Sequence, residues 1–410
     1  MRQSIFAIII IFVIAICSFL LFILYSVLNY QSERQEIQNH LLSLSVSPYY
    51  DNVIKDSKIE IDRQNILGDS FECIMSKHAS ELYSRNRLQI TFKNEIGSDE
   101  GGITREWISL LIDEIFDPKN QLFHFPTDNI TQMSPVKEEL ISQKNIMYYR
   151  FFGRIMGRMI ISKVNADVKL HPIIWKLLLN IPCNHLDFEK ADPEFYRNFM
   201  KLKENPEIVI DLQTSFEEDG IEFIKNGKNI LVNKDNINFY IDEFLKYKYI
   251  TKFEKQVTEM KRGLFETINR NYLKNHSGKS FKLLICGSEN IDFKNWIANT
   301  KYVNYYPAGK TIKWFWEVVK SFSDDEKKLL LQFVTGSSYL PGGGIKNIIG
   351  NNLYKTQFTI SKKESFGDTL LPSSSTCSNT LMLPEYSSKL ILKEKLLWAI
   401  KESNKGFGLC

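Results

Sequence analysis

Cys377 stands in a sequence setting that suits a nucleophilic thiol. It follows the segment 371–376 (LPSSST) and precedes a short run in which Leu381 and Leu383 alternate with other residues. That alternation predicts a β-strand, which places Cys377 on the loop before it. A thiol on a loop is accessible to a large partner, whereas a thiol inside an apolar run is usually buried and unreactive. The pattern indicates a cysteine whose thiol can act as a nucleophile.

Thr376 and Asn379 supply a hydroxyl and an amide on either side of Cys377. Two roles are open to them. They can hold the loop in position, as Thr and Asn do in ordinary turns, or they can donate hydrogen bonds to a negative charge that develops in a reaction at the thiol. We expect positioning of the loop to be the main role of both residues.

The other cysteines and the histidines show no spacing that would make a second site. There is no CxxC pair and no histidine at ligand spacing from a cysteine, so the sequence predicts neither a zinc site nor a disulfide framework. We expect no metal and no cofactor, and this cysteine usage suits a reducing compartment. The cysteines are Cys17, Cys73, Cys183, Cys286, Cys377 and Cys410, and the histidines are His40, His78, His124, His171, His185 and His276.

The composition is that of a globular protein that does not bind nucleic acid. Hydrophobic residues make up 43% of the 410 residues, and 52 basic against 48 acidic residues give a net charge of +4. The basic residues are spread along the chain, whereas nucleic-acid-binding domains concentrate them in patches. The length allows two or three domains.

The cysteine loop must be positioned by a mixture of helices and short strands. Apolar alternation predicts a strand at 88–92, and a glycine-rich turn at 97–102 leads from it to a helix capped by Thr104. Ser323 and Glu326 form a capping box for the helix that follows them. Further helices are predicted at 147–162, 171–180, 240–270, 312–322 and 388–403.

A connector that contains proline and glycine divides the predicted fold into two lobes. Pro307 and Gly309 lie within 303–309, between two helical regions, and this composition predicts a hinge. In this interpretation residues 85–302 form the larger, mainly helical lobe. Residues 310–410 form a compact α/β lobe of ordinary domain size. The predicted fold class is α+β.

A long apolar segment at the N-terminus predicts a membrane anchor. The 24 residues from Ile5 to Leu28 carry no charge, and a helix of that length spans about 36 Å, against roughly 30 Å for the hydrocarbon core of a bilayer. A cleaved signal peptide is the alternative, but its apolar core has about 7–15 residues and a small-residue cleavage site follows it. We therefore expect residues 1–28 to be a retained transmembrane helix and residues 29–84 to be a polar stalk.

Motifs distributed over residues 85–410 resemble the HECT ubiquitin ligases in order and spacing. Each motif alone is weakly specific, whereas the whole set in this order is highly specific. The motifs are GSDEGG (97–102), REW (105–107), FGRIMG (152–157), LLICG (283–287), WFWEVV (314–319), LQFVTGSS (331–338), LPSSSTCSN (371–379), LPEYSS (383–388) and GFGL (406–409).

The resemblance implies a bilobed fold and a two-step transfer of ubiquitin. The larger lobe would bind a ubiquitin-conjugating enzyme, and the smaller, mobile lobe would carry Cys377. Cys377 would accept ubiquitin as a thioester and pass it to a lysine of a protein substrate. The predicted hinge would correspond to the family's flexible linker. Phe407 matches a functional phenylalanine of the family, with packing at the end of the last helix as the alternative.

The implied partners are ubiquitin, a conjugating enzyme, protein substrates and the membrane. Charged conjugating enzyme is cytosolic, so the HECT part would face the cytosol. Met260 and Leu264 lie one helical turn apart in a segment that resembles the family's docking groove, and burial in the core is the alternative. Phe195 and Phe199 form a second candidate pair with the same spacing.

Two residues beside the cysteine depart from the family pattern. The family usually has His before Thr-Cys and Phe after it, and this chain has Ser375 and Ser378. An imidazole beside a thiol can lower the pKa of that thiol, so its loss predicts a slower or differently tuned enzyme. A catalytically weak or dead scaffold that binds the conjugating enzyme is therefore an alternative. A cysteine hydrolase with a distant histidine is a third class, and the intact motif order argues against it.

Overall fold

The computed structural model describes much of the chain from Ser57 to Glu402. The described residues are 57–83, 88–95, 102–125, 132–136, 143–218, 220–288, 290–342, 344–348, 356–364 and 367–402. The predicted transmembrane helix, the first part of the predicted stalk and Phe407 lie outside these residues. Within these ranges, no helix is both long and apolar enough to cross a bilayer.

The described residues up to Ser162 combine helices with small two-stranded sheets. Their elements are β1 (Ser57–Ile61), η2 (Arg63–Asn65), α2 (Ile66–Ser76), α3 (Ala79–Tyr83), β2 (Leu88–Phe92), α4 (Gly102–Phe116), η3 (Pro118–Asn120), β3 (Phe123–His124), β4 (Ser134–Pro135) and α5 (Gln143–Ser162). β2 matches the predicted strand. The mixture of helices and short sheets agrees with the α+β class.

Residues 57–83 belong to the folded part of the chain, so the stalk predicted over 29–84 is wrong for these residues. β1 pairs in parallel with β2, and Ile61 lies opposite Phe92. Ile61 and Ile74 have no exposed surface. The alternation of Ile59 and Ile61 covers only five residues within a polar region, so it is too short to predict a strand. The strand forms because β2 pairs with it.

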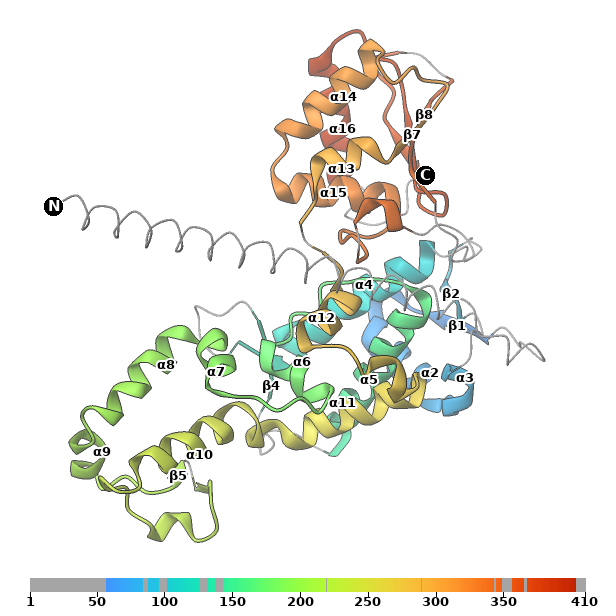
Figure 1. Ribbon diagram of the computed structural model, residues 1–410. Helices are drawn as coiled ribbons and strands as arrows, with labels where there is room; N and C mark the ends of the chain where they lie inside the picture. The colour runs from blue at the N-terminus through green and yellow to red at the C-terminus, as the bar shows by residue number, and fades with distance from the viewer. Residues whose placement is uncertain are drawn as a thin grey trace, which may run out of the picture. The chain divides into compact units, whose positions relative to one another are not determined.

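The second group of elements surrounds a hydrophobic cluster of its own. They are α6 (Pro172–Leu178), α7 (His185–Ala191), α8 (Pro193–Met200), η5 (Lys201–Lys203), α9 (Glu207–Asp211), β5 (Glu217–Glu218), β6 (Ile221–Glu222), η6 (Gly227–Asn229) and α10 (Ile237–Tyr249), shown in green to yellow-green in Figure 1. Phe216, Ile241 and Leu245 lie at the centre of this cluster and are fully buried. A capping box begins α7, because Asn184 accepts from the Asp187 N–H and Asp187 accepts from the Asn184 N–H.

The helix predicted over 240–270 is two helices. α10 ends at Tyr249, and α11 (Glu254–Thr267) begins after the short η7 turn (Thr251–Phe253). Ile250 leaves the helical region with φ −124° and ψ −68°. No glycine or proline lies at this break, so the sequence pattern predicted one continuous helix. Two further elements follow, η8 (Arg270–Leu273) and α12 (Gly278–Cys286).

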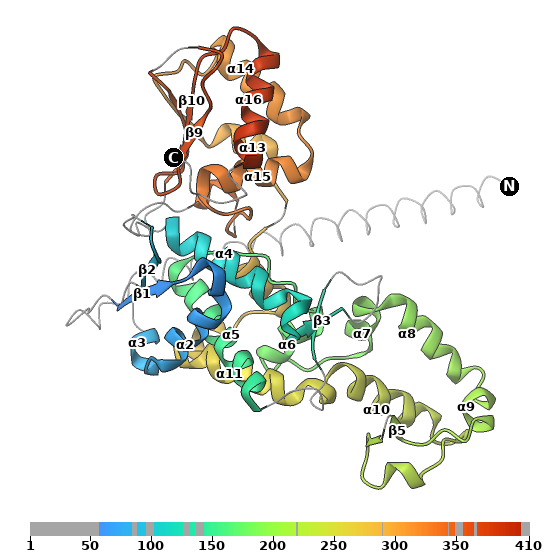
Figure 2. The same cartoon turned by 180° about the vertical axis from the view of Figure 1, so that it is seen from behind.

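The C-terminal elements form a four-stranded sheet with helices against it. They are α13 (Phe293–Ala298), β7 (Thr300–Val303), α14 (Lys310–Ser321), α15 (Asp324–Thr335), η9 (Ile345–Asn347), β8 (Phe358–Lys362), β9 (Ser373–Ser375), β10 (Thr380–Leu383) and α16 (Lys389–Glu402). The strand order is β7-β8-β10-β9, with β9 antiparallel to β10 and the other pairs parallel. α14 and α16 lie side by side on one face of the sheet (Figures 1 and 2).

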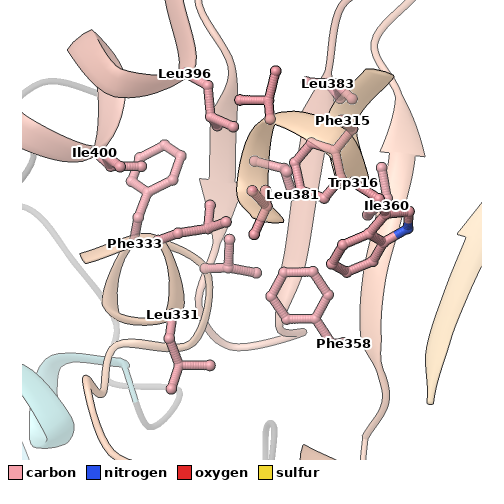
Figure 3. Packing of buried hydrophobic residues seen from close by; sticks show 14 of the residues in the cluster. Phe315, Trp316, Leu331, Phe333, Phe358, Ile360, Leu381, Leu383, Leu396 and Ile400 are labelled. Atoms are coloured by element: carbon pink, nitrogen blue, oxygen red, sulfur yellow. The ribbon is translucent and has the colours of Figure 1, made fainter. Parts of the chain in front are cut away.

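One hydrophobic cluster holds the sheet to these helices. Alternate residues of β8 and β10, among them Phe358 and Leu381, point toward Phe315 of α14 and Leu396 of α16 (Figure 3). Each of these four side chains has no exposed surface. Burial of an aliphatic or aromatic side chain stabilises a fold by about 1.5–3 kcal/mol, so this interface anchors the strand that leads from the cysteine loop. The predicted capping box is present at Ser323, which begins α15.

The predicted hinge at 303–309 lies inside this C-terminal group, so its assignment is wrong. Trp296 of α13, before the segment, has its ring centroid 6.0 Å from that of Trp316, after it. β7, which ends at Val303, is a strand of the same sheet as β8 and β10. Pro307 and Gly309 therefore form a turn within one core. The composition of a turn and that of a hinge are alike, and only packing across the segment separates them.

Candidate active site

Cys377 lies in the tight turn of the β9–β10 hairpin. Ser375 pairs with Thr380 at the end of the ladder, and the four residues Thr376–Asn379 make the turn. The Cys377 side chain is half-buried, and the next residue, Ser378, is exposed. The hairpin gives the thiol a fixed position at one end of a packed sheet, and β10 is the strand that the sequence pattern predicted after the cysteine.

Asn379 holds the end of this turn. Its φ is 51°, a left-handed conformation that asparagine adopts more readily than most residues. Its side chain is fully buried, and Nδ2 donates to Thr356 Oγ1. The backbone carbonyl oxygen of Asn379 accepts from the Thr359 N–H at 3.0 Å. These contacts favour positioning of the loop over direct contact with a reacting oxyanion.

Arg105 of α4 reaches the cysteine loop from a distant part of the sequence. Its Nη1 donates to the Thr376 carbonyl oxygen at 3.1 Å, to Asn379 Oδ1 at 3.5 Å and to the Thr335 carbonyl oxygen. Arg105 begins the REW motif (105–107), and these contacts join α4 to the cysteine loop and to the end of α15.

The other two residues of that motif take structural roles. Glu106 accepts from Arg63 at 2.7 Å, and Trp107 is buried with its Nε1 donating to Ser70 Oγ at 2.8 Å. These contacts fix the first turns of α4, the helix that carries Arg105.

Gly102 allows the cysteine loop to approach the beginning of α4. A Cβ added at Gly102 would lie 2.6 Å from Thr376 Oγ1, which is closer than real Cβ atoms come to other atoms. Gly102 has no positive φ, so glycine is not needed there for backbone conformation. It is needed because a side chain would occupy the place of Thr376. Gly336, at the end of α15, has φ +74° and lies against both Arg105 and Thr376. Two glycines and one guanidinium thus surround Thr376.

One hydroxyl group contacts the sulfur of Cys377, and two more hydroxyl groups lie beyond it. Ser375 Oγ lies 3.1 Å from Cys377 Sγ, within hydrogen-bonding distance for sulfur. Ser378 Oγ lies 3.0 Å from Ser375 Oγ and 3.0 Å from Thr380 Oγ1. The two serines that depart from the family pattern are therefore in contact with each other, and one of them contacts the thiol.

The remaining described cysteines are poor candidates for the nucleophile. Cys286 is buried in α12, with its Sγ 3.6 Å from the Val168 carbonyl oxygen. Burial raises the pKa of the Cys183 thiol to about 11, and burial likewise raises the pKa of Cys73. Thiolate is the reactive form, so these environments suppress reactivity.

Comparison with known proteins decides the family. The model of the HECT domain, described as a ubiquitin-transferase, matches residues 109–410. The chain belongs to the HECT family. It is 34% identical over 359 residues to the E3 ubiquitin-protein ligase TOM1 of Saccharomyces cerevisiae, covering 86% of this chain and 11% of that protein. It is 34% identical over 364 residues to the E3 ubiquitin-protein ligase Nedd-4 of Drosophila melanogaster, covering 87% of this chain and 36% of the fly protein. The chain thus spans a minor part of these relatives' length.

The HECT chain buries Met260 and Leu264, so the predicted docking role of this pair is wrong. Both side chains have no exposed surface. α11 approaches α5 so closely that a Cβ at Gly153 would collide with the Met260 carbonyl oxygen. Their helical spacing places both residues on the face of α11 that is buried in the core, which was the alternative to a docking role.

Phe195 and Phe199 are half-buried and stacked, with ring centroids 5.3 Å apart. Phe199 also packs on Phe244 at 4.6 Å, and the Lys248 ammonium lies 4.1 Å from the Phe195 ring centroid. Each ring has one face against the cluster around Ile241 and some surface exposed. Their role in docking a partner stays a prediction.

Sequence reasoning missed an apolar surface on the same group of elements. We define the apolar surface as Ile208, Leu212, Leu231 and Phe239, all of which are exposed. Backbone pairing brings its parts together, because the Val232 N–H donates to the Thr214 carbonyl oxygen at 2.8 Å. Apolar residues four positions apart, Ile208 in the short α9 and Leu212 directly after its end, were the available signal.

Proposed function

We propose that this chain is a HECT-type ubiquitin ligase in which Cys377 carries ubiquitin as a thioester. The observation that supports this most strongly is the position of Cys377. It lies in a hairpin turn held by buried Asn379 and by Arg105, and it is not enclosed in a core. Membership in a family described as ubiquitin-transferases and the names of the relatives support the reaction class.

The proposed reaction consists of two acyl transfers. Cys377 Sγ attacks the thioester carbon that joins ubiquitin to the conjugating enzyme. A new S–C bond forms, and the conjugating enzyme's thiolate leaves with its electron pair. The amine of a substrate lysine then attacks the Cys377 thioester. An amide bond forms, Cys377 leaves as the thiolate, and the extra proton of the amine passes to water.

We propose that the conjugating enzyme docks on the apolar surface and on the neighbouring Phe195 and Phe199. Exposed aliphatic and aromatic side chains grouped on one subdomain are typical of protein-binding sites. Family membership implies a conjugating enzyme as a partner, and this surface replaces the buried Met260 and Leu264 as its candidate site.

We propose further that movement between the two parts of the chain occurs at Gly287, in place of 303–309. Gly287 follows α12, whose Phe281 packs on Trp175, and it precedes α13, whose Trp296 lies in the C-terminal cluster. Its φ is +75°. A single glycine between two separately packed clusters can absorb a backbone rotation.

Charging of the full-length protein tests this function. Incubation with charged conjugating enzyme should give a ubiquitin adduct on a non-reducing gel that reducing agent removes. Cys377→Ala should abolish the adduct, and the matched control Cys286→Ser should retain it. No adduct on the wild-type protein would support the scaffold alternative, and loss of ubiquitin conjugates would support a hydrolase. An adduct that survives Cys377→Ala would overturn the assignment of the cysteine.

A further inference from the structure

The hydroxyl groups around Cys377 form a continuous chain that ends on the sulfur. Ser375 Oγ contacts Cys377 Sγ at 3.1 Å, Ser378 Oγ contacts Ser375 Oγ at 3.0 Å, and the Ser378 hydroxyl also contacts Thr380 Oγ1 at 3.0 Å. All four residues belong to the β9–β10 hairpin, so the backbone pairing of Ser375 with Thr380 fixes the spacing.

The reactive form of the sulfur sets the direction of the last bond in this chain. A hydroxyl has one hydrogen and two lone pairs. When Ser378 donates to Ser375 Oγ, the single hydrogen of Ser375 remains free to point at the sulfur. A thiolate can only accept a hydrogen bond, so in the reactive form of Cys377 the bond at 3.1 Å must run from Ser375 to Sγ.

We propose that Ser375 is a catalytic residue that donates a hydrogen bond to the Cys377 thiolate, and that Ser378 is a positioning residue that orients and polarises the Ser375 hydroxyl. This inference rests on the proposed role of Cys377 and deepens it. The same thiolate is the attacking group in the first acyl transfer and the leaving group in the second. A donor that stabilises the anion therefore favours the formation of the nucleophile and its departure.

The proposal assigns a joint role to Ser375 and Ser378, the two residues that differ from the His and Phe of the family pattern. An imidazole at position 375 would titrate near neutral pH, whereas a serine hydroxyl stays neutral throughout the physiological range. A hydroxyl at position 378 is useful because it contacts the hydroxyl at 375, and a phenylalanine there could not donate. The pair supplies an uncharged donor in place of a titrating one.

The expected effect of the Ser375 hydroxyl on the reactivity of Cys377 is modest. A hydrogen bond to a charged group is stronger than one between neutral groups, but the site is only half-buried and water competes. Loss of the Ser375 donor removes one hydrogen bond to the reacting sulfur, and we expect the reactivity of Cys377 near neutral pH to fall by about threefold.

The test is alkylation of Cys377 by iodoacetamide in the full-length protein, followed by mass spectrometry of the peptide that contains residue 377. Rates are measured from pH 6 to pH 10 for the wild-type protein, Ser375→Ala, Ser375→Thr and Ser378→Ala. We expect Ser375→Ala to be alkylated about threefold more slowly than the wild-type protein near neutral pH. Ser378→Ala should slow the reaction by less, and Ser375→Thr should restore the wild-type curve of rate against pH. Ser374→Ala, on the other face of the strand, is the matched control and should leave the curve unchanged.

This readout separates the inference from the proposed function, because alkylation requires neither ubiquitin nor a conjugating enzyme. Identical curves for the wild-type protein and Ser375→Ala would overturn the role of Ser375, even if Cys377 forms a thioester. A shift in Ser375→Thr as large as that in Ser375→Ala would show that packing and not the hydroxyl is responsible. If Ser375→Ala does not fold, Ser378→Ala decides the question, because Ser378 is exposed and its loss does not disturb the core.

Discussion

At the scale of single residues, one side chain from a distant segment, Arg105, binds the cysteine loop. Cys377, Thr376 and Asn379 lie within four positions, and their turn chemistry is visible in the sequence. Arg105 is 271 positions from Thr376, so no local pattern links them. Only the folded structure brings Arg105 to the cysteine loop.

Arg105 provides the prediction at this scale. Arg105→Ala removes the guanidinium that binds the Thr376 carbonyl oxygen and Asn379 Oδ1, so the loop loses its fixed position. We expect transfer of ubiquitin from Cys377 to free lysine to slow by about tenfold, since a hydrogen bond from a charged group contributes about 1.5–3 kcal/mol and about 1.4 kcal/mol equals a factor of ten. Single-turnover discharge of the preformed thioester measures this rate.

Two variants control that experiment. Arg105→Lys keeps the charge but lacks the planar fork, so it should recover only part of the rate. Arg262→Ala removes an exposed arginine that pairs with Glu259, and it should discharge at the wild-type rate. Unchanged discharge in Arg105→Ala, with normal thermal unfolding, would mean that the loop does not depend on this contact.

At the scale of elements, the sequence predicted helices and strands well where a local signal begins or ends them. The capping box at Ser323 and the alternation in β2 and β10 are such signals. The break between α10 and α11 has no signal of this kind, and the turn at 303–309 has the composition of a hinge but lies within one core. Both errors concern packing between segments, which periodicity does not encode.

The corrected hinge gives the prediction for this scale. Gly287 has φ 75° and ψ −168°, a conformation that is essentially restricted to glycine. Gly287→Ala therefore strains the backbone by about 1–3 kcal/mol, and the added Cβ would collide with the Leu340 carbonyl oxygen. We expect slower transfer of ubiquitin to or from Cys377 with unchanged binding of the conjugating enzyme. Pro307→Ala, at an exposed turn position, is the matched control and should leave transfer unchanged. The reverse outcome, slow transfer in Pro307→Ala alone, would restore the hinge at 303–309.

At the scale of the whole molecule, the fold class and the family were predicted from the sequence, and the boundaries were not. The family match and the order of motifs agree because both depend on many residues in register. The beginning of the folded part was placed too late, because β1 gains its stability from β2 and carries little signal alone. The N-terminal apolar segment lies outside the described residues, and its role as an anchor remains a prediction.

Membrane fractionation tests the anchor. Full-length protein should remain in the membrane pellet after carbonate washing, because 24 uncharged residues bury far more apolar area than an interfacial helix does. Deletion of residues 1–30 should release the protein from the pellet. Protease added to sealed vesicles should remove a C-terminal tag if the HECT part faces the cytosol. A protected tag, or release of the full-length protein by carbonate, would contradict the predicted topology.

The most direct test of the central claim is to map the ubiquitin attachment site in the Cys377→Ser variant of the full-length protein. An oxygen ester is less reactive than a thioester, so this variant should trap ubiquitin after incubation with charged conjugating enzyme. Mass spectrometry of the trapped adduct should find the C-terminal glycine of ubiquitin esterified to residue 377. Attachment to Cys183, Cys286 or another cysteine, or a wild-type thioester that maps elsewhere, would contradict the assignment of Cys377 as the residue that carries ubiquitin.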